Sequence, residues 1–198
     1  MSNEIDIQLV KDNYSRMGNE ELVHIATKDA AGMTPEAQVV IREELKKRNL
    51  DSNLIKGVNA QNKNFDETEF LEYCEIIRGL NCPVCGSSQK KLNATITNQV
   101  ISFIIITHRS KNVVIGCPDC LDKANNGALI TSLLLGWWGF PWGIIRTIQA
   151  VVDGVQNKKT NHSDQPNNYL KQIVRSKIGL LEVYKNNKEK LQEAISVK

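Results

Sequence analysis

Apolar residues recur at three- and four-residue steps in two stretches of the first fifty residues. The first begins at Asn19, which can cap a helix, and runs to about Ala30. The second starts with Thr34 as cap and Pro35 in the first turn, where the missing N–H costs nothing. These stretches predict an N-terminal helical hairpin module within residues 1–50, with residues 1–13 loosely structured. The apolar stripe of the second helix is Ala37, Val40, Ile41 and Leu45.

Residues 51–63 are rich in polar side chains and favour a connector between modules. Asp66 and Glu69 then form a capping box, because a carboxylate at the cap and another three residues on can satisfy two free backbone amides. This pattern predicts a helix that runs to about Arg78.

The region that follows is rich in β-branched residues with turn residues between them. Three runs, 92–97, 99–107 and 111–115, predict the strands of a small antiparallel sheet. The turns between the runs are expected at Asn98 and at residues 108–110.

No charged residue occurs from Ala124 to Ile145. Glycines and Pro141 interrupt this stretch near its middle, and a proline inside a helix removes a donor and clashes with the preceding turn. Two short helices, about 124–136 and 141–155, are therefore expected. Each would cover roughly 20 Å, less than the roughly 30 Å hydrocarbon core of a bilayer.

Apolar residues again recur at helical spacing after Pro166, which predicts a C-terminal amphipathic helix over 166–197. The whole pattern indicates an α+β fold. We expect four segments: the helical module 1–50, a helix with a metal-binding sheet over 64–122, an apolar helical hairpin over 123–156, and the C-terminal helix over 166–197.

Two Cys-Pro-x-Cys pairs, Cys82 with Cys85 and Cys117 with Cys120, are separated by residues 86–116. Four thiolates in two such turns suit the tetrahedral coordination of Zn²⁺. With the sheet between the pairs, this layout is that of a zinc ribbon with four cysteine ligands. Redox dithiols, disulfides and a rubredoxin-like iron site are the alternatives, and the spacing and context favour each of them less.

Charge divides the chain into two parts. Residues 1–77 hold nine Lys and Arg against fifteen Asp and Glu, and residues 78–198 hold sixteen against seven. A basic half favours an anionic partner, either nucleic acid or a lipid surface, although solvated helix faces give the same count. The polar, acidic beginning of the sequence does not resemble a secretory signal, so we expect the cysteines in a reducing cytoplasm.

The uncharged stretch predicts a hairpin that enters one leaflet of a membrane. Tryptophans are typical of the membrane–water interface, and Lys123, Lys158 and Lys159 flank the stretch on both sides, which suits a cytoplasmic location of both ends. The same residues could instead fill a soluble core or form an interface between copies of the chain. The residues expected to contact lipid are Leu133, Leu134, Leu135, Trp137, Trp138, Phe140, Trp142, Ile144 and Ile145.

Cys-Pro-x-Cys turns followed by Gly-Trp-Trp-Gly-x-Pro-Trp-Gly resemble a pattern of uncharacterised bacterial proteins that are described as zinc-ribbon or membrane-associated. The pattern in this sequence consists of Cys117, Pro118, Cys120, Gly136, Trp137, Trp138, Gly139, Pro141, Trp142 and Gly143. The N-terminal helices similarly resemble short modules attached to bacterial membrane proteins. The resemblance implies association with a membrane and implies no activity.

The sequence contains no recognisable catalytic motif, and its three histidines are isolated. We therefore expect a non-catalytic Zn²⁺ protein that acts as a scaffold or interaction module at the cytoplasmic side of a membrane. Its expected partners are a lipid surface and an unknown protein. The alternatives are a cytoplasmic zinc ribbon that binds nucleic acid, and a homo-oligomer joined through the Trp-rich hairpin.

Overall fold

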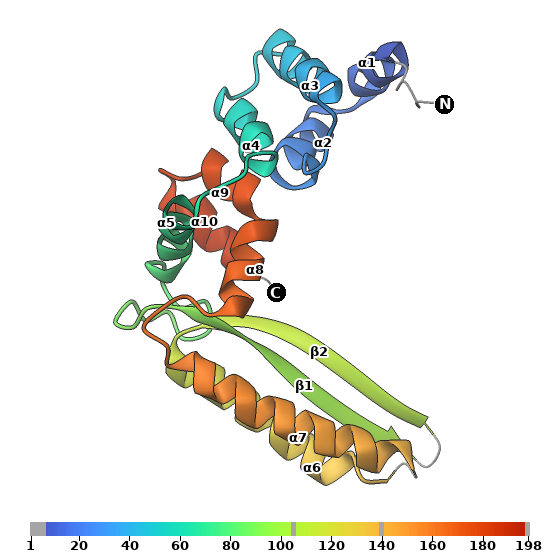
Figure 1. The fold of residues 1–198 in the computed structure, drawn as a ribbon, viewed down its shortest axis with the longest axis vertical. Helices are drawn as coiled ribbons and strands as arrows, with labels where there is room; N and C mark the ends of the chain where they lie inside the picture. Colours follow the sequence, from blue (N-terminus) through green and yellow to red (C-terminus); the bar gives the residue numbers. More distant parts are fainter. Residues whose placement is uncertain (1–6, 104–105, 139–140, 197–198) are drawn as a thin grey trace. The chain divides into compact units, whose positions relative to one another are not determined.

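A computed structural model describes residues 7–103, 106–138 and 141–196. It shows an α+β protein, as expected, with many helices and a two-stranded antiparallel sheet (Figure 1). The chain forms two compact units. Unit 1 comprises residues 1–73 and 173–191, and unit 2 comprises residues 74–172 and 192–198.

Unit 1 is helical and begins with α1 (Ile7–Arg16), a segment predicted to be loosely structured. Next come α2 (Asn19–His24), a π-helical turn η1 (Ile25–Asp29) and α3 (Pro35–Lys47). Thr34 caps α3 as predicted, because its hydroxyl accepts a hydrogen bond from the amide of Ala37 at 3.3 Å. The predicted cap of α2 differs: Gly18 holds that position, and its amide donates to Glu21 Oε2 at 2.7 Å.

Helix α3 packs against α1, and Arg48 just after α3 holds the two together. Its guanidinium donates to the carbonyl of Tyr14 at 3.0 Å and to the carbonyl of Met17 at 2.6 Å. These carbonyls lie at the C-terminal end of α1, where backbone acceptors lack helical partners. The stripe predicted for α3 is buried in the core of unit 1.

The polar connector predicted for residues 51–63 is instead helix α4 (Asn53–Gln61). It packs against α9 (Ile178–Val183), and Gly57 lies at the contact. A Cβ atom on Gly57 would come within 2.7 Å of the carbonyl oxygen of Ala26 and within 3.1 Å of that of Gly179. Gly57, within the segment predicted to be a connector, therefore permits close helix packing.

The single C-terminal helix predicted over 166–197 is divided into α8 (Asn168–Ser176), α9 and α10 (Lys188–Ile195). The break before α10 has a local cause, since Asn187 Oδ1 accepts a hydrogen bond from the amide of Lys190 at 3.0 Å and caps the new helix. Helix α5 (Glu67–Arg78) is capped by Asp66 as predicted, with 2.8 Å between Oδ1 and the amide of Glu69.

Unit 2 contains one long β-hairpin rather than the three short strands that were predicted. Strands β1 (Asn93–Phe103) and β2 (Ile106–Gly116) pair from Asn93 opposite Gly116 to Phe103 opposite Ile106. Asn98 was expected in a turn, but it pairs with Lys111 within the ladder. Its side chain is buried and donates to Asp153 Oδ2 at 3.1 Å, a distant contact that outweighs its turn preference.

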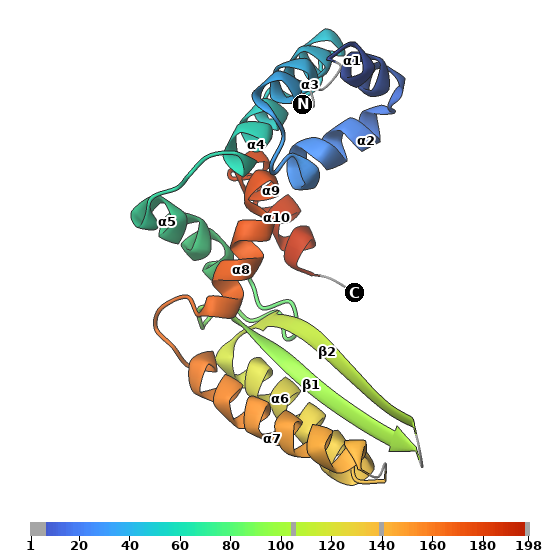
Figure 2. The same ribbon diagram turned by 45° about the vertical axis from the view of Figure 1, so that its right-hand side comes forward.

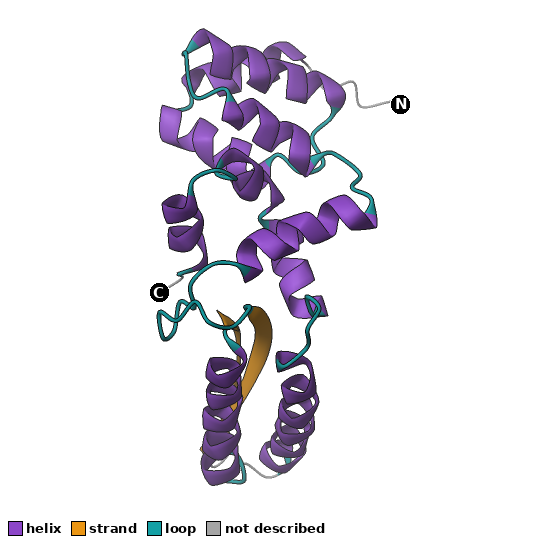
Figure 3. Ribbon diagram, turned by 90° about the vertical axis from the view of Figure 1, so that its left-hand side faces the viewer, coloured by secondary structure: helices purple, strands orange, loops and turns teal. Residues whose placement is uncertain are grey.

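Helices α6 (Pro118–Leu135) and α7 (Trp142–Asn161) lie side by side along the β-hairpin (Figures 1 and 2). Figure 3 shows the same pair of helices with the strands running along it. The two expected helices of the uncharged stretch are thus present and longer than predicted. Among the described helices, none is both long and apolar enough to cross a membrane.

Candidate metal centre and exposed apolar face

The sulfur atoms of Cys82, Cys85, Cys117 and Cys120 all lie within 4.8 Å of one another. The pairing of Asn93 with Gly116 explains this, because it brings the residues before β1 next to those after β2. Cys82 and Cys85 lie in the loop before β1, Cys117 is the N-cap of α6, and Cys120 lies in the first turn of that helix.

The geometry of the four sulfur atoms suits a metal ion. Cys85 Sγ and Cys117 Sγ are 3.8 Å apart. Zn–S bonds of about 2.3 Å at tetrahedral angles require sulfur atoms about 3.8 Å apart. Gly86 has φ +75°, a conformation that glycine adopts without strain, and its amide donates to the carbonyl of Cys82 at 2.7 Å. This tight turn keeps the first two sulfur atoms together.

Local electrostatics differ among the four thiols. Burial alone would raise the pKa of Cys82, but backbone amides of Cys117, Cys85 and Val84 donate to its sulfur and lower the pKa to about 7. The amide of Cys117 is 3.3 Å from that sulfur. Burial raises the pKa of Cys120. A cation would stabilise the thiolate form of all four groups, as a bound metal does.

The buried side of α6 and α7 contains several polar side chains besides Leu121 and Ala150. The hydroxyl of Ser132 accepts a hydrogen bond from the amide of Val100 at 3.0 Å, and Asn157 Nδ2 donates to the carbonyl of Ile96 at 2.7 Å. We call the buried polar residues on this side the inner seam: Asn125, Ser132, Thr147, Asn157 and Asn161.

Glycines allow the helices to approach one another and the sheet closely. A Cβ atom on Gly136 would overlap the hydroxyl of Thr147, and one on Gly143 would lie 2.8 Å from Ser102 Oγ. Close packing through small and hydroxyl-bearing residues is typical of helices in membranes, where packing and hydrogen bonds replace the hydrophobic effect.

The opposite side of the helix pair is apolar and exposed. Trp138 is 71% exposed, Leu134 66% and Trp142 62%. We call the exposed apolar residues of this side the outer face: Ile130, Leu133, Leu134, Leu135, Trp137, Trp138, Trp142, Ile145, Ile148, Val152 and Val155. Eleven exposed large apolar residues on two neighbouring helices and the turn between them favour an interaction site.

Most residues predicted to contact lipid lie on the outer face. Ile144 is half-buried, and Phe140 lies outside the described residues. The prediction missed Ile148, Val152 and Val155, which continue the outer face along α7. Their spacing from Ile145 by three, four and three residues is the helical signal that could have found them.

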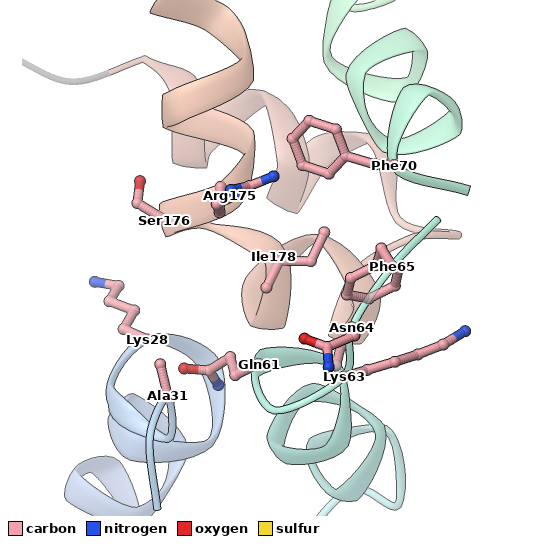
Figure 4. Close-up of a pocket in the computed structure, with 11 residues that line it drawn as sticks. Lys28, Ala31, Gln61, Lys63, Asn64, Phe65, Phe70, Arg175, Ser176 and Ile178 are labelled. Carbon is pink, nitrogen blue, oxygen red and sulfur yellow. The ribbon is translucent and has the colours of Figure 1, made fainter. Parts of the chain in front are cut away.

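A separate pocket of about 490 Å³ lies within unit 1. Figure 4 shows Arg175 beside Phe70, and the guanidinium carbon lies 5.1 Å from the ring centre. Lys28 of η1, Gln61 and Ser176 also line it. None of the described residues that line this pocket is Asp, Glu, His or Cys.

Comparison with known proteins identifies no relative: no protein-family model, curated protein or solved structure matches this chain.

Proposed function

We propose that the protein is a non-catalytic zinc-ribbon protein that attaches to the cytoplasmic face of a membrane through its outer face. The observation that carries this proposal is the reversed polarity of α6 and α7. The amide and hydroxyl side chains of the inner seam are buried, and Ser132 and Asn157 bond β1, whereas the leucines, isoleucines, valines and tryptophans of the outer face are exposed. Water disfavours this arrangement, and a hydrocarbon environment favours it.

The aromatic residues support an interfacial location rather than a span. Trp137, Trp138 and Trp142 lie around the turn between the two helices, and Trp138 Nε1 already donates to the carbonyl of Leu134 at 3.1 Å. An indole suits the interface because its ring is apolar and its N–H is polar. Amphipathic helices that bury one face in the headgroup region attach proteins without crossing the bilayer.

Zinc is the proposed metal because four thiolates form a soft ligand set, and Zn²⁺ accepts tetrahedral sulfur coordination. Four protein ligands fill the coordination sphere, so the ion would have a structural role. Thiolates remain available for metal in a reducing compartment, which supports the cytoplasmic side. The helices of unit 1 would then offer a surface to a protein partner.

Cell fractionation tests the attachment. We expect the wild-type protein in the membrane fraction and a variant with Trp137→Ser, Trp138→Ser and Trp142→Ser in the soluble fraction. Val39→Ser, which removes an exposed apolar residue from α3, is the control and should remain with the membrane. A wild-type protein found wholly in the soluble fraction would overturn the proposal.

Analytical ultracentrifugation without detergent separates lipid attachment from self-association. If the outer face joins two copies, the wild type sediments as a stable dimer and the triple tryptophan variant as a monomer. That result, together with no affinity for vesicles, would assign the outer face to a homo-oligomer instead.

A further inference from the structure

A small pocket opens at the end of the helix pair that carries the tryptophans. It measures about 350 Å³ and is lined by Thr107 and Arg109 of β2 and by Trp142 and Arg146 of α7. Two arginines and an exposed tryptophan thus line one opening. Small-molecule sites range from about 300 to 1,000 Å³, so the pocket suits a single compact group.

The two arginines differ in how they are held. Arg109 is mostly buried, and its Nη2 donates to Asp153 Oδ2 at 3.0 Å, which fixes its position. The same carboxylate oxygen accepts a hydrogen bond from Asn98. Arg146 is exposed, and no described carboxylate lies within ion-pair distance of it. One arginine held by an ion pair and one exposed arginine therefore line the pocket.

Carboxylates are scarce around this end of unit 2. Residues 93–116 contain no Asp or Glu, and Asp153 is the only one in residues 124–161. His108 and Lys111 lie near Arg109 on β2 and add no negative charge. The pocket therefore lacks an internal anion to balance Arg146.

Helix α7 adds a further favourable interaction for an anion. It has twenty residues and begins at Trp142, so the positive end of its dipole lies at the pocket. Arg146 follows Trp142 by four residues, which brings both onto the same side of the helix. A guanidinium can bind two oxygens of a phosphate at once.

We propose that this pocket binds the phosphate of an anionic phospholipid headgroup while Trp142 and the neighbouring outer face contact the interface. The inference depends on the membrane attachment proposed above and adds a lipid preference to it. The exposed apolar residues beside the pocket favour a headgroup as the source of the phosphate, because a lipid can contact them and a free phosphate cannot.

Vesicle co-sedimentation of the full-length protein tests the pocket. The two vesicles are phosphatidylcholine alone, and phosphatidylcholine mixed with phosphatidylglycerol. The wild type should bind both and prefer the mixture. Arg146→Gln should reduce that preference by about fivefold, the effect of one basic residue at an anionic surface. Arg146→Lys should restore only part of it, because an ammonium keeps the positive charge but lacks the planar fork.

Lys159→Gln is the matched control, since it removes one exposed positive charge from the other end of the same helix. Equal losses in both variants would indicate diffuse attraction and overturn the pocket. Equal binding of the wild type to both vesicles would also overturn it while leaving membrane attachment intact. Absence of binding to either vesicle would instead refute the attachment itself and the pocket with it.

Free glycerol phosphate distinguishes the source of the phosphate. Calorimetric titration without vesicles should show no saturable binding to the wild type. Saturable binding that Arg146→Gln abolishes would assign the pocket to a soluble anion and overturn the lipid proposal. Thermal unfolding of both glutamine variants should match the wild type, because both side chains are exposed.

Discussion

Ser132→Ala tests whether the inner seam holds α6 on the sheet. Ser132 and Val100 are fully buried, and the serine hydroxyl accepts the hydrogen bond of the Val100 amide at 3.0 Å. Val100 lies opposite Arg109 of β2 in the ladder, but its amide donates to Ser132 of α6. The alanine variant would leave a buried amide without this acceptor, a loss of about 1–3 kcal/mol.

The free energy of unfolding, measured by urea denaturation and followed by circular dichroism, should fall by about 2 kcal/mol. For a chain of this size the same loss lowers Tm by about 4–8 °C. Thr131→Ala is the control, because its hydroxyl bonds only the carbonyl of Gly127 in its own helix, at 3.0 Å. If Ser132→Ala is as stable as the wild type, the inner seam does not hold α6 on the sheet.

The complementary change is Leu134→Ser on the outer face. Leu134 is 66% exposed, so stability should change by less than about 0.5 kcal/mol. Binding to vesicles should weaken by about tenfold, because a leucine that enters lipid contributes at least about 1.5 kcal/mol. Ser132→Ala should keep that binding at a temperature where it is folded. If Leu134→Ser is less stable but binds vesicles as well as the wild type does, Leu134 is not an exposed residue that contacts lipid.

Three further predictions concern the metal centre, the buried thiol of Cys74 and the carboxyl group of Glu44. Purified wild type should contain one zinc per chain by mass spectrometry. Cys82→Ser should lose the zinc and the native circular dichroism of unit 2, because a structural ion supplies folding free energy. Burial raises the pKa of Cys74 to about 11, so a disulfide reagent at pH 8 should modify it only after denaturation; rapid modification of the native chain would be inconsistent with its burial. The hydrogen bond from Arg48 lowers the pKa of Glu44, so its contribution to stability is present above the unfolded pKa of the carboxyl and is lost as pH falls through the folded pKa. Glu44→Gln should flatten this acidic part of the stability profile, and an unchanged profile would exclude that role.

Local signals in the sequence predicted several features well. The caps at Thr34 and Asp66 depend on side chains that bond amides three residues away, so the residues themselves carry the information. The cysteine cluster was predictable for a similar reason, since each Cys-Pro-x-Cys turn contributes two sulfur atoms and the intervening hairpin brings the turns together.

Contacts between distant residues account for the main failures. Asn98 would form a turn by its own preference, but Asp153, far along the chain, holds it in β1. The polar residues 51–63 suggested a connector, whereas Gly57 among them permits α4 to approach α9. Residues 124–145 are all uncharged, so the charge pattern gave no indication of which side of each helix is buried. Only packing against β1 determines which side of each helix is buried.

The division of the chain has a consequence for synthesis on the ribosome. Val183 belongs to the same core cluster as Leu54 and Val58, yet the whole of residues 74–172 emerges between them. The core of the first seventy residues must therefore wait for α9, and the side of this core that contacts α9 stays open until residues 74–172 have emerged. At about 5–20 residues per second that wait lasts several seconds or more, an interval in which a chaperone would have access to the open core.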